Sequence, residues 1–367
     1  METADTMTLL SRYIFKEFIS LVVVVLVGIL CVYLCVEFLQ KADKLIKQHA
    51  TFSQAMRYFL YSMPIMITMS LPMASLIAAL LSLGNLSRHN EIIAMRAGGV
   101  SLFTIIAPLL AGGLLISLFG FLNNEIIMPA CTSRANQIRN VEIEKKQMQV
   151  MFQQSRLWLR GPENSIVNIE LVSPNRNEML GLHVYKLNPD YSVRERITAG
   201  SLLWENGAWK LKNSRTITVQ GDTVRSRVSD GETFNIVESP DDLGAVVKDS
   251  EEMNFVEMWE YVKRLKTSGY QSAKYEVNLH KKIAFPLASL LVVLISVPFA
   301  FQKVRAGGAS KGFAFAILIA SAYLVLMSVG QSLGNSGVLP PIVAAWLANA
   351  VFAVASVIVL VRMQRTI

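Results

Sequence analysis

Hydrophobic residues in this chain form two blocks of long, nearly uncharged runs, and the segment between them has the mixed pattern of a water-exposed domain. A helix needs about 20 predominantly apolar residues to cross a bilayer. Each block holds three runs of about that length. The predicted membrane spans are Tyr13–Leu39, Tyr58–Leu83, Val100–Leu122, Ile283–Phe301, Gly312–Leu333 and Val338–Val361. The pattern therefore predicts a polytopic α-helical membrane protein with six transmembrane helices.

Proline occurs at particular places in these spans. Pro64 and Pro72 interrupt the second span, which is tolerated in a membrane helix when neighbouring helices cover the freed backbone groups. The pair Pro340-Pro341 suits the start of the last helix, because proline fits the first helical turn.

The segment from about Asn124 to Leu279 carries the signals of β-strands. Short β-branched or aromatic runs are separated by turn residues, and they are Leu157–Arg160, Ile166–Ile169, Leu182–Leu187 and Thr216–Val219. Between Trp204 and Trp209, the pair Asn206-Gly207 is the strongest short-range signal for a hairpin. Regular short strands of this kind predict a sandwich, a jelly roll or an open barrel.

One amphipathic helix is predicted near 254–268, after the strands. Asn254 is a suitable N-cap, and Gly269 is a suitable end. Its apolar face would contain Phe255, Met258, Trp259, Val262 and Leu265. The expected organisation is three spans in residues 1–123, an inserted all-β domain with this helix in 124–279, and three spans in 280–367.

The charge of the chain fits a membrane protein better than a nucleic-acid-binding protein. Only 17% of residues are charged and the net charge is +8, whereas soluble domains carry about 25% charged residues. The sequence has no basic cluster with interleaved aromatic residues. Basic residues beside membrane spans explain the net charge, and no nucleic-acid partner is expected.

The lysines and arginines of short loops predict the orientation, because they concentrate on the cytoplasmic side. With the N-terminus inside, most of the basic residues near the spans lie in the cytoplasm: Arg12, Lys16, Arg88, Arg96, Lys303, Arg305, Lys311, Arg362 and Arg365. Both termini are then cytoplasmic and the β-domain lies outside. Lys41, Lys44 and Lys47, after the first span, go against this rule.

Residues for catalysis are scarce. A nucleotide-hydrolysing chain needs a glycine-rich phosphate loop ending in Gly-Lys-Ser/Thr, and the sequence has none. The four histidines lie in four different segments, and the three cysteines do not make a disulfide framework. The spans hold almost none of the polar groups that an intramembrane protease would need. We therefore expect no enzymatic activity, no metal and no cofactor in this chain.

The loop between the second and third spans predicts a short amphipathic helix within 85–97. Asn85 or Ser87 could cap it, and Gly98 or Gly99 would end it. Its side chains combine apolar and charged groups, namely Ile92, Met95, Arg88, Glu91 and Arg96. Such a helix suits docking to a partner. A helix lying on lipid headgroups has the same pattern, so the residues alone leave both readings open.

Several stretches resemble the LptF/LptG (YjgP/YjgQ) family of lipopolysaccharide-export permeases. They are the opening Leu10–Tyr13, the loop Leu83–Gly99, the segment Met253–Pro286 with its ending Tyr275–Lys282, and the start of the last span at Leu339-Pro340-Pro341. The resemblance covers nearly the whole chain in the order three spans, β-domain, three spans. The opening and the stretch Gly269–His280 are more similar to the LptG-type subunit.

The resemblance implies the membrane part of an ABC transporter that extracts lipopolysaccharide from the Gram-negative inner membrane. Members pair as an LptF–LptG heterodimer on two copies of the cytoplasmic ATPase LptB, so ATP is used by the partner. The periplasmic jelly roll passes lipid to a bridge reached through LptC. By position, Glu91 is the acidic coupling residue, with Arg88, Met95 and Arg96 around it. A cavity lined by the first and fifth spans would shrink and push lipid toward the β-domain.

The resemblance also implies basic residues near the outer end of the first span that bind lipid phosphates. Lys41, Lys44 and Lys47 are the candidates, since ammonium groups favour phosphate, and this role would explain their unusual side of the membrane. Glu37 stands where some G-type members have a basic residue, which leaves the full ligand set open. Solvated surface lysines are the alternative interpretation.

Two other functions fit the same physical pattern. A permease for another lipid or for a lipoprotein shares every feature above, and the family resemblance alone separates it from lipopolysaccharide export. A membrane-anchored periplasmic scaffold or enzyme is the other alternative, and it would not associate with an ATPase.

Overall fold

The computed structural model describes residues 2–144, 150–153, 156–161, 164–172, 177–205, 207–220, 223–234, 249–267, 271–300 and 308–366. The chain forms two compact units. The first unit contains Met1–Lys47, Phe59–Thr132 and Ala273–Ile367, and the second contains Gln48–Tyr58 and Ser133–Ser272.

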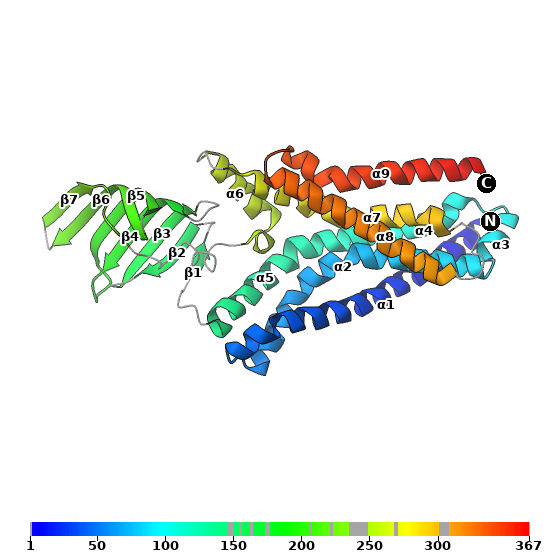
Figure 1. Ribbon diagram of the computed structural model, residues 1–367, viewed down its shortest axis with the longest axis horizontal. Coiled ribbons are helices and arrows are strands. Elements are labelled where there is room, and N and C mark those ends of the chain that lie inside the picture. Colours follow the sequence, from blue (N-terminus) through cyan, green and yellow to red (C-terminus); the bar gives the residue numbers. More distant parts are fainter. Residues whose placement is uncertain are drawn as a thin grey trace. The chain divides into compact units, whose positions relative to one another are not determined.

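Six helices among the described residues are long and apolar enough to cross a membrane, as the sequence predicts. They are α1 (Glu2–Lys47), α2 (Phe52–Arg88), α4 (Leu102–Leu122), α7 (Ala273–Ala300), α8 (Gly308–Asn335) and α9 (Pro341–Thr366). Pro64 and Pro72 lie inside α2, and α9 begins at Pro341, as expected. The two chain termini lie at the same end of the helix bundle (Figure 1), which fits an even number of crossings.

The third span is longer than expected. After α4, the helix continues through η1 (Asn123–Ile127), α5 (Met128–Gln137) and η2 (Ile138–Ile143), of which η1 and η2 are π-helical. Asn123 Nδ2 donates hydrogen bonds to Pro64 O at 2.8 Å and to Thr68 Oγ1 at 2.7 Å. Asn123 thus binds α2, and the helix continues past Leu122, where the predicted third span ends.

Glycines let neighbouring helices of the first unit approach closely. A Cβ atom on Gly112 would lie 2.7 Å from the ring of Phe18, and one on Gly330 would lie 2.5 Å from the backbone oxygen of Ala344. Gly112 therefore brings α4 against α1, and Gly330 brings α8 against α9. Close packing at small residues is a main source of helix association in lipid, where hydrophobic burial contributes little.

A buried asparagine connects three of the C-terminal helices. Asn349 on α9 donates to Ala284 O on α7 at 2.7 Å and accepts from the Tyr323 hydroxyl on α8 at 2.8 Å. Polar groups in apolar surroundings need such partners, so this residue fixes the relative positions of α7, α8 and α9.

The buried residues of helix α1 lie near its N-terminal end. From Leu9 onward, its buried residues are Ile14, Phe18 and Val22, which form one stripe at helical spacing. They join a core cluster with Leu86 of α2, Ile92 of α3 (Glu91–Ala97) and residues of α4. Beyond Val22 the side chains of α1 are exposed or half-buried. The C-terminal part of this helix is therefore more loosely packed within the single chain, where Val25, Ile29 and Phe38 still contact other helices.

The second unit contains a seven-stranded antiparallel sheet in which strands pair in chain order (Figure 1). The strands are β1 (Val150–Gln153), β2 (Arg156–Gly161), β3 (Ser165–Val172), β4 (Glu178–Leu187), β5 (Val193–Glu205), β6 (Ala208–Gln220) and β7 (Thr223–Ser229). All four predicted strand segments lie in these strands. Neighbour-to-neighbour pairing makes the described sheet a meander, and the jelly roll implied by the family stays a prediction.

The predicted hairpin and helix of the second unit are confirmed. Trp204 on β5 pairs with Trp209 on β6, and Gly207 in the turn has a φ of +79°. After a 3₁₀ turn, η4 (Ser250–Glu252), the helix α6 (Phe255–Thr267) is capped by Asn254 Oδ1, which accepts the Glu257 N–H at 2.8 Å.

The apolar face of α6 differs from the expected one. Met258, Val262 and Leu265 are buried, whereas Trp259 is 51% exposed and lies under the Lys263 ammonium group. The predicted end at Gly269 lies outside the described residues.

Candidate functional site

The predicted helix over 85–97 is divided in the structure. Helix α2 continues through Asn85 and Ser87 to Arg88, and α3 begins at Glu91, after Asn90 in the left-handed conformation with a φ of 59°. The prediction that Asn85 or Ser87 caps a separate helix was wrong. The Asn85 carbonyl accepts the backbone N–H of His89 at 3.1 Å, which continues α2 instead.

The predicted end of this helix is confirmed. Gly99 N–H donates to Arg96 O and Val100 N–H donates to Met95 O, both at 3.0 Å. These bonds form a Schellman motif, in which the residue after the C-cap takes a left-handed conformation. Gly99 has a φ of +82°, so glycine is required here for a conformational reason.

The predicted coupling residues do not all face the same way. Arg88 and Arg96 are exposed and Glu91 is half-buried, whereas Met95 packs against the protein's own core beside Ile92. Met95 therefore attaches α3 to the core of the first unit. Exposed apolar residues are Ile93 on α3, at 65%, and Phe103 at the start of α4, at 72%. Neither was predicted. The sequence shows that one of the adjacent residues Ile92 and Ile93 must face outward, but it does not show which one.

Helix α3 also has polar neighbours on α1, which no sequence pattern predicts. The Tyr13 hydroxyl lies against the Glu91 carboxylate. Glu17 Oε1 lies 3.4 Å from Asn85 Nδ2, and the Glu17 carboxylate also interacts electrostatically with Glu91 and His89. The N-terminal end of α1, the end of α2 and the start of α3 thus share one polar cluster.

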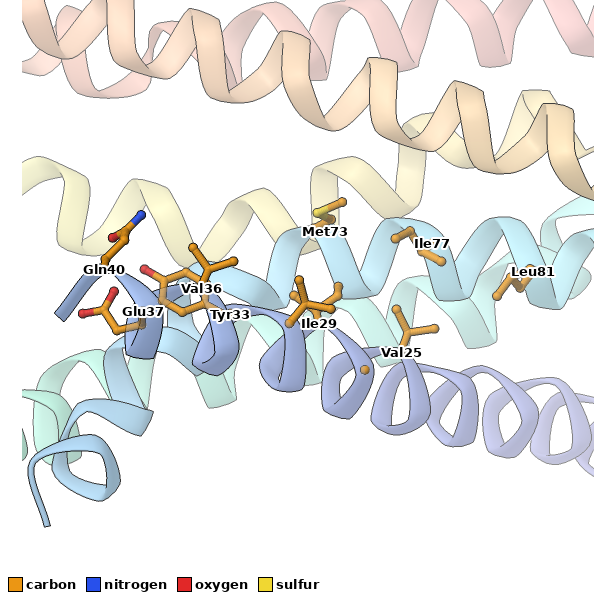
Figure 2. A pocket seen from close by; sticks show the side chains of 11 residues that line it. Val25, Ile29, Tyr33, Val36, Glu37, Gln40, Met73, Ile77 and Leu81 are labelled. Atoms are coloured by element: carbon orange, nitrogen blue, oxygen red, sulfur yellow. The ribbon is translucent and has the colours of Figure 1, made fainter. Parts of the chain in front are cut away.

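A cavity of about 790 Å³ lies between α1 and α2, toward the other end of α1. Its walls are mostly apolar, and the lining residues are Val25, Gly28, Ile29, Val32, Tyr33, Val36, Glu37, Gln40, Met73, Ile77 and Leu81. Figure 2 shows Glu37 and Gln40 together at one end of the cavity, while Val25 and Leu81 lie at the opposite end. The cavity is therefore amphipathic along its length.

This cavity differs from the expected one. A cavity between the first and fifth spans was expected, but the residues lining this one belong to the first and second spans. The reason is the packing of α1, which is buried at Ile14, Phe18 and Val22 and touches α2 again at Phe38, whose ring lies 5.9 Å from that of Phe59.

The three candidate lysines lie in the last turns of α1 and have different surroundings. Lys41 forms an ion pair with Glu37, whose side chain lines the cavity. Lys44 is exposed. Lys47 Nζ lies 2.8 Å from Asp43 Oδ2, with 72% of the Lys47 side chain exposed. Lys41 is thus the lysine linked to the cavity, through its ion pair with Glu37.

Six spans, an inserted antiparallel sheet and an amphipathic cavity at the first span define a polytopic membrane permease. Within the described residues, no group of His, Cys, Asp or Glu could hold a metal ion. The chain belongs to the lipopolysaccharide export system permease LptF/LptG family, whose model matches residues 12–362.

Two relatives support this assignment. The lipopolysaccharide export system permease protein LptG of Escherichia coli K12 is 26% identical over 358 residues, covering 96% of this chain and 98% of that protein. The LptG protein of Haemophilus influenzae is 20% identical over 348 residues, covering 94% and 96%. Both relatives are of the G type, in agreement with the prediction from the opening of the sequence.

The end of α3 generates a prediction about its stability. Gly99→Ala places a side chain at a φ of +82° and should cost about 1–2 kcal/mol locally. Amide hydrogen exchange in residues 91–100 should therefore accelerate about five- to thirtyfold. Gly98→Ala is the matched control, because Gly98 has a φ of −77° and its added Cβ would approach no atom closer than 3.4 Å. Equal exchange in the two variants would contradict the assigned role of Gly99.

Proposed function

We propose that this chain is the permease subunit of an ABC transporter that extracts lipopolysaccharide from the inner membrane and passes it toward a periplasmic bridge. The observation that carries the proposal is the amphipathic cavity on α1, which combines an apolar wall with a lysine-linked polar end. Membership of the lipopolysaccharide export permease family identifies the class of lipid.

The two parts of the cavity suit the two parts of such a lipid. Residues such as Ile29, Met73 and Ile77 offer the apolar surface that acyl chains prefer. Glu37 and Gln40 lie at the polar end, and Lys41 is bound to Glu37. A phosphorylated sugar at this end would accept charge-assisted hydrogen bonds from ammonium groups.

Phosphate binding at Lys41 requires competition with Glu37. The Lys41 and Glu37 side chains are 29% and 19% exposed, and partly exposed pairs of this kind contribute only about 0.2–1 kcal/mol. A phosphate group carries more charge than a carboxylate and can displace Glu37 from the ammonium group. Lys44 is exposed and adds a second donor, and Lys47 contributes after leaving Asp43.

The exposed apolar surface of α1 suits a second permease. Val24, Val27 and Val32 are each more than half exposed in the single chain, and exposed apolar patches beside a cavity are typical of interaction sites. An LptF-type paralogue bound there would complete the cavity and form the heterodimer. The LptC-type bridge protein would receive the lipid from the β-domain.

The α3 region suits the ATPase partner. Arg88 and Arg96 provide exposed charge, Ile93 and Phe103 provide exposed apolar contacts, and Glu91 lies between them at the start of α3. With an LptB-type ATPase dimer bound here, α3 and both termini are cytoplasmic and the sheet is periplasmic. ATP binds only to the partner, and this chain holds no cofactor and catalyses no reaction.

The first test concerns docking of the ATPase. Glu91→Lys reverses the charge at the start of α3 and should reduce ATPase retention during co-purification by at least about tenfold, since a lost charged contact in an interface costs 2 kcal/mol or more. Glu232→Lys, an exposed reversal in the second unit, is the control and should retain the ATPase. Full retention by Glu91→Lys would show that Glu91 does not couple to the ATPase.

The second test concerns the lipid. Lys41→Glu with Lys44→Glu should weaken photo-crosslinking of lipopolysaccharide to a probe at Val32 by several-fold, because phosphate would then meet carboxylates. Glu37→Gln should strengthen it, because Lys41 is released. Lys212→Glu, an exposed lysine of the second unit, should leave crosslinking unchanged.

The same adducts separate the lipid alternatives when they are identified by mass spectrometry. Lipopolysaccharide as the main adduct supports the proposal. If the main adduct is a different lipid or a lipoprotein, the chain is a permease for that molecule instead. Unchanged crosslinking after the double charge reversal would argue against phosphate binding by these lysines.

A further inference from the structure

Two features of the polar cluster at the N-terminal end of α1 destabilise the folded state. Glu17 and Glu91 lie close enough for their carboxylates to repel each other. Glu17 Oε2 is shielded from solvent and accepts no hydrogen bond among the described residues. Unsatisfied buried acceptors and neighbouring like charges both oppose folding. The cluster therefore does not serve stability alone, and its arrangement depends on the packing around it.

That packing is the same stretch of α1 that anchors the helix. Tyr13 and Glu17 alternate with Ile14 and Phe18 over the same turns. Ile14 and Phe18 are fully buried in the core cluster that also contains Ile92 of α3. The side of α3 that faces this core and the polar start of α3 are therefore both in contact with one short segment of α1.

The remainder of α1 leads directly to the cavity. The helix is continuous from Glu2 to Lys47 and contains no proline, so it can move as one body. Cavity-lining residues begin at Val25, just beyond the last buried residue, Val22. Glu37 lies roughly 36 Å along the helix from Tyr13, at 1.5 Å per residue. A small rotation at the anchored end would therefore produce a large displacement at the polar end of the cavity.

We propose that Tyr13 and Glu17 are positioning residues that couple α3 to α1, so that a movement of the docking helix displaces the wall of the lipid cavity. Tyr13 transmits the movement through its contact with Glu91, and Glu17 senses the charge of Glu91. When a basic group of the ATPase binds Glu91, the repulsion on Glu17 falls and the N-terminal turns of α1 shift. This inference rests on the proposed function, because it requires the partner ATPase at α3.

Tyr13→Phe tests the coupling in the complete transporter with its ATPase and paralogous permease. The variant keeps the ring and removes the hydroxyl that meets Glu91. We expect unchanged complex formation and ATP hydrolysis, with lipopolysaccharide released per ATP reduced about fivefold, the lower end of typical coupling between sites. Lys16→Gln, on an exposed position of the same turn, is the control and should release lipid as the parent does.

A double-mutant cycle distinguishes coupling from a merely structural role. In a Glu91→Gln background, Tyr13→Phe should cause no further loss of lipid released per ATP, because the contact is already weakened. Additive losses, or loss of the ATPase from Tyr13→Phe complexes, would overturn the inference. Glu17→Gln should also change the lipid released per ATP, because it removes the repulsion from Glu91, and an unchanged ratio would exclude the charge-sensing role.

The proposed function can fail separately. If the parent complex releases no lipopolysaccharide when ATP is supplied, the proposed function is wrong. If the parent releases lipid and Tyr13→Phe releases it equally well, only the coupling through α1 is wrong.

Discussion

The packing of Ile14, Phe18 and Val22 against the helices around them is the constraint on which the rest of the structure depends. In lipid, a helix gains little by burying apolar side chains, because acyl chains are equally apolar, so close contact decides where a helix is fixed. Gly112 provides that contact by accepting the ring of Phe18. Beyond Val22 no residue of α1 is buried among those described. The helix is therefore anchored at one end, and its other end is available for a lipid cavity.

The other spans of the first unit are connected by buried polar groups. Asn123 holds the start of η1 to α2 through Pro64 and Thr68, and Asn349 connects α9 to α7 and α8. Such hydrogen bonds in apolar surroundings have no competing water and fix the register of the helices. The bundle can then act as a frame against which α1 moves. Lipid export requires this division, because a cavity changes volume only if one wall moves relative to another.

Much of the architecture follows from the sequence, because the length and periodicity of hydrophobic runs are strong signals of secondary structure. The six spans need only enough apolar residues to cross a bilayer, and the Trp204–Trp209 hairpin needs only its Asn-Gly turn. Features that depend on contacts between segments far apart in the sequence were missed. The third span was predicted to end at Leu122, but Asn123 finds its hydrogen-bond partners on α2 and the helix continues. Asn85 was predicted as a cap, yet its carbonyl continues α2. The pairing of Glu37 with Lys41 is compatible with their i, i+4 spacing. The cavity beside Glu37 depends on how α1 packs along α2, and no local sequence pattern predicts that packing.

In the proposed mechanism, α1 moves relative to the rest of the helix bundle when the ATPase acts on α3. The most direct measurement is the distance between spin labels at Leu39 on α1 and Val354 on α9, which are 72% and 60% exposed and lie on the moving helix and on the frame. It would be made by pulsed electron paramagnetic resonance in the lipid-reconstituted transporter, without nucleotide and with ATP trapped. We expect a different distance in the ATP-bound state, because α1 moves against the frame as the cavity closes. The same distance distribution in both states, in a complex that exports lipopolysaccharide, would contradict it.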